Sequence, residues 1–186
     1  MKVLPREFYA RNTVTVAKEL LGKSLIRKNG TSVISGIICE TEAYRHKDDP
    51  ASHAYRGMTE RNKAMFGEVG HAYVYFTYGM YFCVNAVAKS NNSDAGAVLI
   101  RALKPQKGVE LMKKYRKTES ISNLTDGPAK LTQALRINRD QYGVDLAKKS
   151  ELYITEGIDL KLKIISDKRV GIKNGVDKRW NFKIDI

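Results

Sequence analysis

Short apolar runs alternate with polar segments along this chain, and their spacing predicts a protein of mixed helix and strand. Asn12 or Thr13 can cap a helix that ends at Gly22. A second helix is expected to start at Pro105, and a third to open at Asp126-Gly127-Pro128. The inward faces of these helices are expected to carry Val14, Ala17, Leu20, Leu21, Val109, Met112, Tyr115, Leu131, Ala134 and Leu135.

The other apolar runs are β-branched or alternating, as in strands. A strand over 24–27 turns at Lys28-Asn29-Gly30, a strong hairpin signal, into a buried strand over 33–40. Further strands are expected over 97–103, which carries Arg101, and over 158–164. The polar segment 45–57 between them reads as an irregular loop, and residues 61–66 as a helical turn.

The segment 73–85 alternates about Tyr78-Gly79-Met80, and because glycine permits a positive φ we expect a hairpin tip there. Tyr73 and Tyr75 would share a face on one strand, and Cys83 and Asn85 on the other. Large apolar groups at an exposed tip usually have a use, and wedges of this kind unstack bases in proteins that bind the minor groove.

Carboxylates precede this hairpin in an otherwise apolar strand. Side chains two residues apart in a strand point to the same face. Glu40, Glu42 and Tyr44 would therefore lie on one face, each about 6–7 Å from the next. A carboxylate in an apolar strand is rarely buried without a partner, and Arg101 in its own apolar strand is a natural partner for Glu42. An aromatic ring beside carboxylates suits a pocket that stacks a flat, electron-poor ring and acts on a bond next to it.

The charge of the chain indicates its partner. Its 186 residues, enough for one domain, hold 33 Lys and Arg against 20 Asp and Glu, a net charge of +13. This excess favours a polyanion such as nucleic acid, and no basic amphipathic helix suggests a membrane. No apolar run suggests a signal peptide or a membrane span, and two cysteines without Cys-x-x-Cys spacing argue against disulfides or zinc. We therefore expect an intracellular protein, in the cytoplasm or nucleoid of a bacterium or the nucleus of a eukaryote.

Several motifs, in order and spacing from about residue 7 to the C-terminus, resemble those of the alkyladenine (3-methyladenine) DNA glycosylase family. They are long and specific: Glu40-Thr41-Glu42-Ala43-Tyr44, Ala51-Ser52-His53, Arg61-Asn62 with Met65-Phe66, Tyr73-Val74-Tyr75, Tyr78-Gly79-Met80-Tyr81-Phe82-Cys83-Val84-Asn85, Leu99-Ile100-Arg101-Ala102-Leu103 and Asp126-Gly127-Pro128-Ala129-Lys130-Leu131. One stretch departs from the family pattern. Where members usually carry a proline before an aromatic-Arg-Phe run, this chain has Lys178-Arg179-Trp180-Asn181-Phe182.

The resemblance implies a role for individual residues. Glu42 would be the general base that activates water, and Arg101 would orient that water and the carboxylate. Tyr44 on one side, and His53 with Tyr75 on the other, would sandwich a flipped base. Asn85 would select against normal guanine. Tyr78 would fill the gap that the flipped base leaves in the duplex, with Met80 beside it at the tip.

The fold expected from all of this is one mixed α+β domain over residues 1–186. It would contain a curved, largely antiparallel sheet with surrounding helices, and a protruding hairpin that inserts into DNA. Arg61, Lys63 and Lys130 are candidates for contacts with DNA phosphates. The segment around Arg169-Val170-Gly171-Ile172 would border the pocket.

The chemistry of the residues agrees with hydrolysis of a glycosidic bond. A carboxylate can deprotonate water and offset the positive charge of an oxocarbenium-like sugar. Alkylated purines such as 3-methyladenine and 7-methylguanine are cationic, stack well on tyrosine and leave readily, and hypoxanthine and ethenoadenine are further candidates. The target atom lies inside the duplex, so the nucleotide must be flipped out. We expect a monomeric repair enzyme that acts on double-stranded DNA, leaves an abasic site, and needs no metal or cofactor.

Other readings of the same residues stay open at this point. A bifunctional glycosylase would use one of the many lysines as a nucleophile. A nucleic-acid-binding protein without catalysis would use the tyrosines only for stacking. A thiol hydrolase would use Cys83, His53 and Asn85, although nothing in the sequence indicates a depressed thiol pKa at Cys83.

Overall fold

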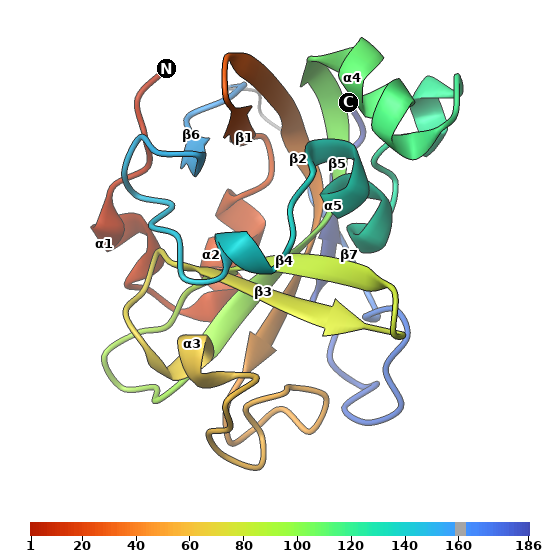
Figure 1. Ribbon diagram of the computed structural model, residues 1–186. Coiled ribbons are helices and arrows are strands. Elements are labelled where there is room, and N and C mark those ends of the chain that lie inside the picture. Colours follow the sequence, from red (N-terminus) through yellow and green to blue (C-terminus); the bar gives the residue numbers. More distant parts are fainter. Residues whose placement is uncertain (159–162) are drawn as a thin grey trace.

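The computed structural model describes residues 1–158 and 163–186. Within them, eight antiparallel strands form one curled sheet with short helices around it (Figure 1). In chain order the elements are α1 (Arg6–Tyr9), α2 (Thr13–Glu19), β1 (Ser24–Asn29), β2 (Ser32–Arg45), α3 (Lys63–Phe66), β3 (Ala72–Thr77), β4 (Tyr81–Val87), β5 (Gly96–Lys107), α4 (Val109–Arg116), η1 (Ile121–Asn123), α5 (Pro128–Leu135), η2 (Arg139–Gln141), β6 (Leu152–Thr155), β7 (Ile165–Asp167) and β8 (Asn181–Lys183).

Strand β2 is the centre of the sheet because it pairs with three other strands, β1, β5 and β8. The sheet runs in the order β3-β4-β5-β2-β1-β6, and β5 lies along one edge of β2 from Ser35 to Arg45. The other edge is shared between β1, which pairs with residues 32–37, and β8, which pairs with Glu40 to Glu42. The C-terminal strand therefore lies directly against the carboxylate-bearing half of β2.

The register between β2 and β5 is irregular beside the carboxylates. Glu40 is opposite Ala102 and Thr41 is opposite Ile100, so Arg101 falls between two pairs and has no Cα partner on β2. Bulges of this kind bend a strand and redirect side chains, and they are frequent next to active sites. Thr41 points to the opposite face, where its hydroxyl donates to the carbonyl of Ala17 in α2 (2.7 Å).

Most predicted elements are confirmed. Asn12 caps α2 by accepting from the backbone N–H groups of Val14 and Thr15. The hairpin at Lys28-Asn29-Gly30 joins β1 to β2, and Pro128 is the first residue of α5. The buried core contains the inward residues of these helices, including Ala17, Leu20, Met112, Leu131, Ala134 and Leu135.

The predicted start of the second helix at Pro105 is wrong. Pro105 lies in β5, which continues to Lys107, and α4 begins at Val109 after Gly108. Pro105 is accommodated where the register shifts, opposite Gly36, whose missing Cβ would lie only 2.9 Å from the Cβ of Leu103. Gly108 has a φ of 73°, which ends the strand and allows the turn into the helix.

The strand predicted over 158–164 includes residues 159–162, which lie outside the described part of the chain. Ile158 and Ile164 on either side of them are not in strands. The last strands of the sheet are instead β6, which pairs with β1, β8, which pairs with β2, and β7, which pairs with β8. None of the helices in the described ranges is long and apolar enough to cross a bilayer.

Candidate active site

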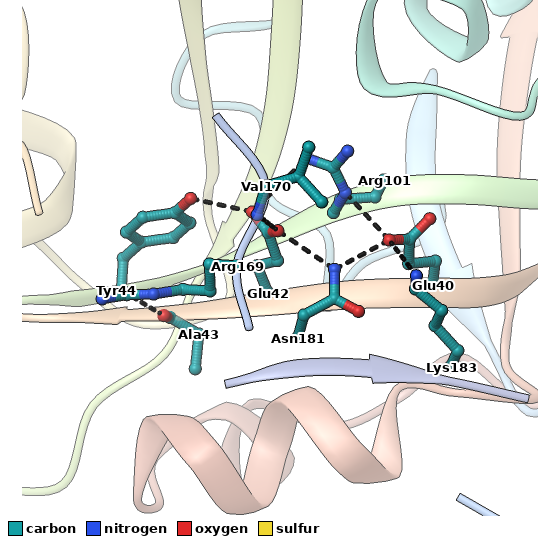
Figure 2. A network of polar contacts seen from close by, with 9 residues as sticks. All are labelled: Glu40, Glu42, Ala43, Tyr44, Arg101, Arg169, Val170, Asn181 and Lys183. Carbon is teal, nitrogen blue, oxygen red and sulfur yellow. Dashed lines mark hydrogen bonds and ion pairs between the residues drawn. The ribbon is translucent and has the colours of Figure 1, made fainter. Parts of the chain in front are cut away.

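Glu42 is fully buried, and its carboxylate is held by four donors, one each from β2, β5, the segment at Val170 and β8 (Figure 2). Oε1 accepts from the backbone N–H of Val170 (2.7 Å) and from Nδ2 of Asn181 (3.0 Å). Oε2 accepts from the hydroxyl of Tyr44 (2.8 Å) and from Nη1 of Arg101 (3.4 Å). A carboxylate has about four lone-pair positions, so Glu42 is satisfied as an ionised acceptor.

The two oxygens of Glu42 differ in their surroundings. Tyr44, Arg101 and Val170 line a cavity of about 350 Å³, within the range of small-molecule sites of about 300–1,000 Å³. Both donors on Oε2 thus border the cavity, whereas only one of the two donors on Oε1 does, because Asn181 does not line it. A water molecule in the cavity would most readily replace the long 3.4 Å contact on Oε2.

Tyr44, Glu42 and Glu40 do share one side of β2, as the alternation predicted, and Arg101 is hydrogen-bonded to both carboxylates (Figure 2). The closest carboxylate to Arg101 is nevertheless Glu40, at 3.0 Å from Nε. Burial and the neighbouring Glu42 raise the pKa of Tyr44. Its hydroxyl therefore keeps its proton and acts as a donor to Glu42.

The cavity is walled by aromatic residues, and the structure brings together every pocket residue that the sequence suggested. Tyr44, His53, Tyr75 and Asn85 all line it, as do Tyr73, Cys83, Leu99 and residues 170–174. The pairs Tyr75 with Cys83 and Tyr73 with Asn85 stand opposite one another in the β3–β4 hairpin, which confirms the shared face. Asn85 is buried and its amide donates to the carbonyl of Tyr73 (2.9 Å), which fixes its orientation.

His53 lies on the irregular loop after β2 and packs edge-on against Tyr75, with ring centroids 4.7 Å apart. Its Nδ1 is hydrogen-bonded to the hydroxyl of Tyr73 (2.9 Å). Desolvation, with a smaller contribution from the Arg61 cation, lowers the pKa of His53 to about 4. The imidazole is therefore neutral at pH 7, and it does not repel a cationic ring in the cavity.

Two residues to which the sequence analysis assigned no role hold this loop. Buried Asn62 donates from its amide to the carbonyls of His53 (2.7 Å) and Gly57 (2.9 Å). Asp49 forms a fully buried ion pair with Arg169, with oxygen–nitrogen distances of 2.6 and 2.7 Å. This pair ties the His53 loop to the segment that carries Val170, so two walls of the cavity are joined.

Arg169 also lies behind Tyr44. Its guanidinium carbon is 4.7 Å from the centroid of the Tyr44 ring and 5.4 Å from that of Trp180. The run that departs from the family pattern is thus part of the site. Trp180 packs on Arg169, and Asn181 reaches both carboxylates from β8. Sequence alone gave no signal for this, because Asn181 lies 139 positions from Glu42.

The hairpin tip is exposed as predicted: Tyr78 and Met80 are 84% and 64% accessible. Tyr78 and Gly79 both have positive φ, 52° and 67°, as the central residues of a type I′ turn require. Such a φ is costly for tyrosine, by about 1–2 kcal/mol. Placing a large ring in this conformation at an exposed tip is consistent with the wedge role expected for it, which remains a prediction.

The candidates for phosphate contacts lie on the surface and already have protein partners. Arg61 lies 5.3 Å from the centroid of the Tyr75 ring and donates to the carbonyl of Phe76 (3.3 Å). Lys63 is paired with Glu60 (2.9 Å), and Lys130 with Asp126 (2.9 Å). A phosphate would have to compete with these contacts, which are weak because they are exposed to solvent.

The cysteines have the surroundings of structural residues. Burial raises the pKa of Cys39 to about 11 and also raises that of Cys83. A thiol hydrolase would require the opposite shift at Cys83, so the site does not favour that reading. Across residues 1–158 and 163–186, no cluster of His, Cys, Asp and Glu has the arrangement of a metal site.

Comparison with known proteins agrees with this geometry. Residues 7–185 match the family described as "Methylpurine-DNA glycosylase". The chain belongs to this family. A relative from Carboxydothermus hydrogenoformans, named "Putative 3-methyladenine DNA glycosylase", is 49% identical over 97% of this chain and 94% of its own length. Relatives with the same name from Clostridium acetobutylicum and Methanocella arvoryzae are 45% and 46% identical, over 99% and 92% of this chain and 94% and 86% of their own lengths.

Membership of the methylpurine-DNA glycosylase family makes the chain a DNA glycosylase of DNA repair, a hydrolase of N-glycosyl bonds. The matched residues 7–185 include β2, the β3–β4 hairpin, β5 and the C-terminal segment.

Proposed function

We propose that this protein releases damaged purines from double-stranded DNA with a water molecule activated by Glu42, and leaves an abasic site. The substrates we expect are 3-methyladenine, 7-methylguanine, hypoxanthine and ethenoadenine. The observation that carries the proposal is the buried Glu42 carboxylate, whose Oε2 contacts Tyr44 and Arg101 at the edge of an aromatic cavity. We further propose that the enzyme acts as a monomer inside the cell, in base excision repair.

In this reaction the damaged nucleotide leaves the duplex and its base enters between Tyr44 and the pair His53 and Tyr75. Neutral His53 and the tyrosine faces suit a cationic purine. Tyr78 would occupy the space vacated in the stack, with Met80 beside it. Asn85, fixed by its hydrogen bond to the Tyr73 carbonyl, would lie against the edge of the base and exclude normal guanine.

The chemical step needs a proton acceptor beside the sugar. Water would replace the 3.4 Å contact between Arg101 and Oε2, and Arg101 would then donate to both the water and the carboxylate. As the bond from C1′ to the base nitrogen breaks, its electron pair leaves with the base, and a cationic purine departs as a neutral molecule. The water oxygen bonds to C1′ and its proton passes to Oε2 of Glu42.

Single-turnover base release tests the proposal on duplexes that each contain one hypoxanthine, one ethenoadenine or one 7-methylguanine. Glu42→Gln should slow release by roughly 10²–10⁴-fold while duplex binding survives. Glu151→Gln is the matched control, because Glu151 also pairs with an arginine, Arg27, but does not line the cavity and immediately precedes the edge strand β6. Equal rates for Glu42→Gln and wild type would refute the proposed role of Glu42.

Two alternatives have their own outcomes in the same system. Lys173 lines the cavity, so a bifunctional enzyme with a lysine nucleophile would be trapped on DNA by borohydride. A strong adduct that Lys173→Gln abolishes would replace the water mechanism. Salt-sensitive binding without release of any base would instead favour a protein that only binds nucleic acid.

A further inference from the structure

One amide group joins the two carboxylates of the site. The Nδ2 of Asn181 donates to Oε1 of Glu40 (2.7 Å) and to Oε1 of Glu42 (3.0 Å) (Figure 2). Asn181 is itself fully buried, and its Oδ1 has no hydrogen-bond partner among the described residues. A buried oxygen without a partner is costly, so the two charge-assisted bonds on the amide nitrogen decide the orientation of this side chain.

Glu40 receives most of the positive charge nearby. Nε of Arg101 is 3.0 Å and Nζ of Lys183 is 3.7 Å from Oε1 of Glu40. Glu42 receives only the longer contact of 3.4 Å from Nη1 of Arg101. Two carboxylates thus share two cations, and the cations lie closer to Glu40, whereas Glu42 is the carboxylate that contacts the cavity residues Tyr44 and Val170.

This distribution matters because an arginine with one carboxylate in reach prefers two parallel hydrogen bonds to it. Without the charge on Glu40, the guanidinium of Arg101 would close on Glu42 and take the Oε2 lone pair that a water molecule needs. The register irregularity at Arg101 places its side chain between both carboxylates and makes the division possible.

We propose that Glu40 and Asn181 are positioning residues of the glycosylase reaction. Glu40 draws Arg101 away from Glu42, and Asn181 fixes the separation of the two carboxylates, so that the contact between Arg101 and Oε2 of Glu42 stays long enough for a water molecule to replace it. This proposal rests on the proposed function, because it concerns the same base and the same water molecule. It adds a second carboxylate and a buried amide to the groups on which the reaction depends.

Glu40→Gln is the sharpest test, because glutamine keeps an acceptor oxygen for Asn181 and Arg101 and removes only the charge. Single-turnover release of 7-methylguanine should fall by about 10–10²-fold, since a small displacement at the reacting centre is enough for a loss of that size. Affinity for a duplex with the same lesion should change less than about threefold, because Glu40 does not line the cavity. Glu151→Gln, which removes the charge from another arginine pair, should release base at the wild-type rate.

A double-mutant cycle separates positioning from general damage to the fold. If Glu40 acts through Glu42, the double variant Glu40→Gln, Glu42→Gln should release base as slowly as Glu42→Gln alone. An additional 10-fold loss in the double variant, or a Glu40→Gln rate equal to wild type, would overturn the proposal. Asn181→Leu gives an independent test: combined with Glu42→Gln, it should release base as slowly as Glu42→Gln alone. This variant replaces Glu40→Gln if thermal unfolding shows that Glu40→Gln is unstable.

The outcomes for the proposal and for the proposed function are distinct. Base release by the wild type that depends on Glu42 but is unaffected by Glu40→Gln and Asn181→Leu would leave the function standing and remove the positioning role. No release by the wild type from any lesion would remove both.

Discussion

The buried ion pair between Asp49 and Arg169 offers the most direct test of how the cavity is held together. Both side chains are fully buried. Oδ1 of Asp49 accepts from Nη2 of Arg169 and from the N–H of Ala51, and Oδ2 accepts from Nη1 of Arg169 and from the N–H of Arg45. In Asp49→Asn, one of these oxygens becomes an NH₂ group that faces two donors, and the buried arginine loses its counter-charge.

The expected cost is large. Removing one partner of a buried pair typically costs about 3–5 kcal/mol, because an uncompensated charge remains. For a chain of this length, such a loss lowers the melting temperature by about 6–20 °C. The matched control is the adjacent Asp48→Asn, since Asp48 pairs with Arg45 at the surface and should cost no more than about 1 kcal/mol.

Urea unfolding followed by circular dichroism, with calorimetry for the melting temperature, measures both variants. The double variant Asp49→Asn, Arg169→Met should recover part of the loss, because it removes the stranded charge. A cost for Asp49→Asn as small as that for Asp48→Asn would show that the pair does not hold the His53 loop to the Val170 segment. Strictly additive losses in the double variant would contradict the electrostatic explanation.

Three further predictions concern the cavity and the tip. The His53 ring takes up a proton only as the pH falls toward 4, so its NMR resonances should keep neutral-form shifts from pH 8 to pH 6, and a midpoint near 6.5 would contradict this. Tyr78→Ala should weaken binding of lesion duplexes more than of undamaged duplex, and equal losses would count against a wedge. Cys83→Ala should keep base release within about threefold of wild type, and abolished release in a folded variant would revive the thiol mechanism.

Local patterns in the sequence were enough for most of the fold. The Asn12 cap, the turn at Gly30 and the Tyr78-Gly79-Met80 tip each depend on a few adjacent residues, and each occurs where it was predicted. The helix predicted from Pro105 was wrong because a residue without an N–H suits an irregular point in a strand as well as the start of a helix. In the structure Pro105 lies in a strand, opposite Gly36.

The sequence also determined which residues face the cavity. Alternation along β2 and the hairpin put Glu42, Tyr44, Tyr73 and Tyr75 on their faces, because side chains in a strand change sides at every residue. The resemblance to the glycosylase family assigned expected roles to the same positions. Arg101 was expected beside Glu42, but neither pattern nor resemblance indicated that Val170 and Asn181 would hold its carboxylate.

Only the tertiary structure decided that. Val170 and Asn181 reach Glu42 from segments 128 and 139 residues away, and Asp49 meets Arg169 across 120 residues. These contacts exist because β8 pairs with the far half of β2, and because the β2–β5 register shifts at Arg101. Hydrogen bonds between distant segments follow from which strands pair in the sheet, and no local periodicity of the chain encodes that pairing.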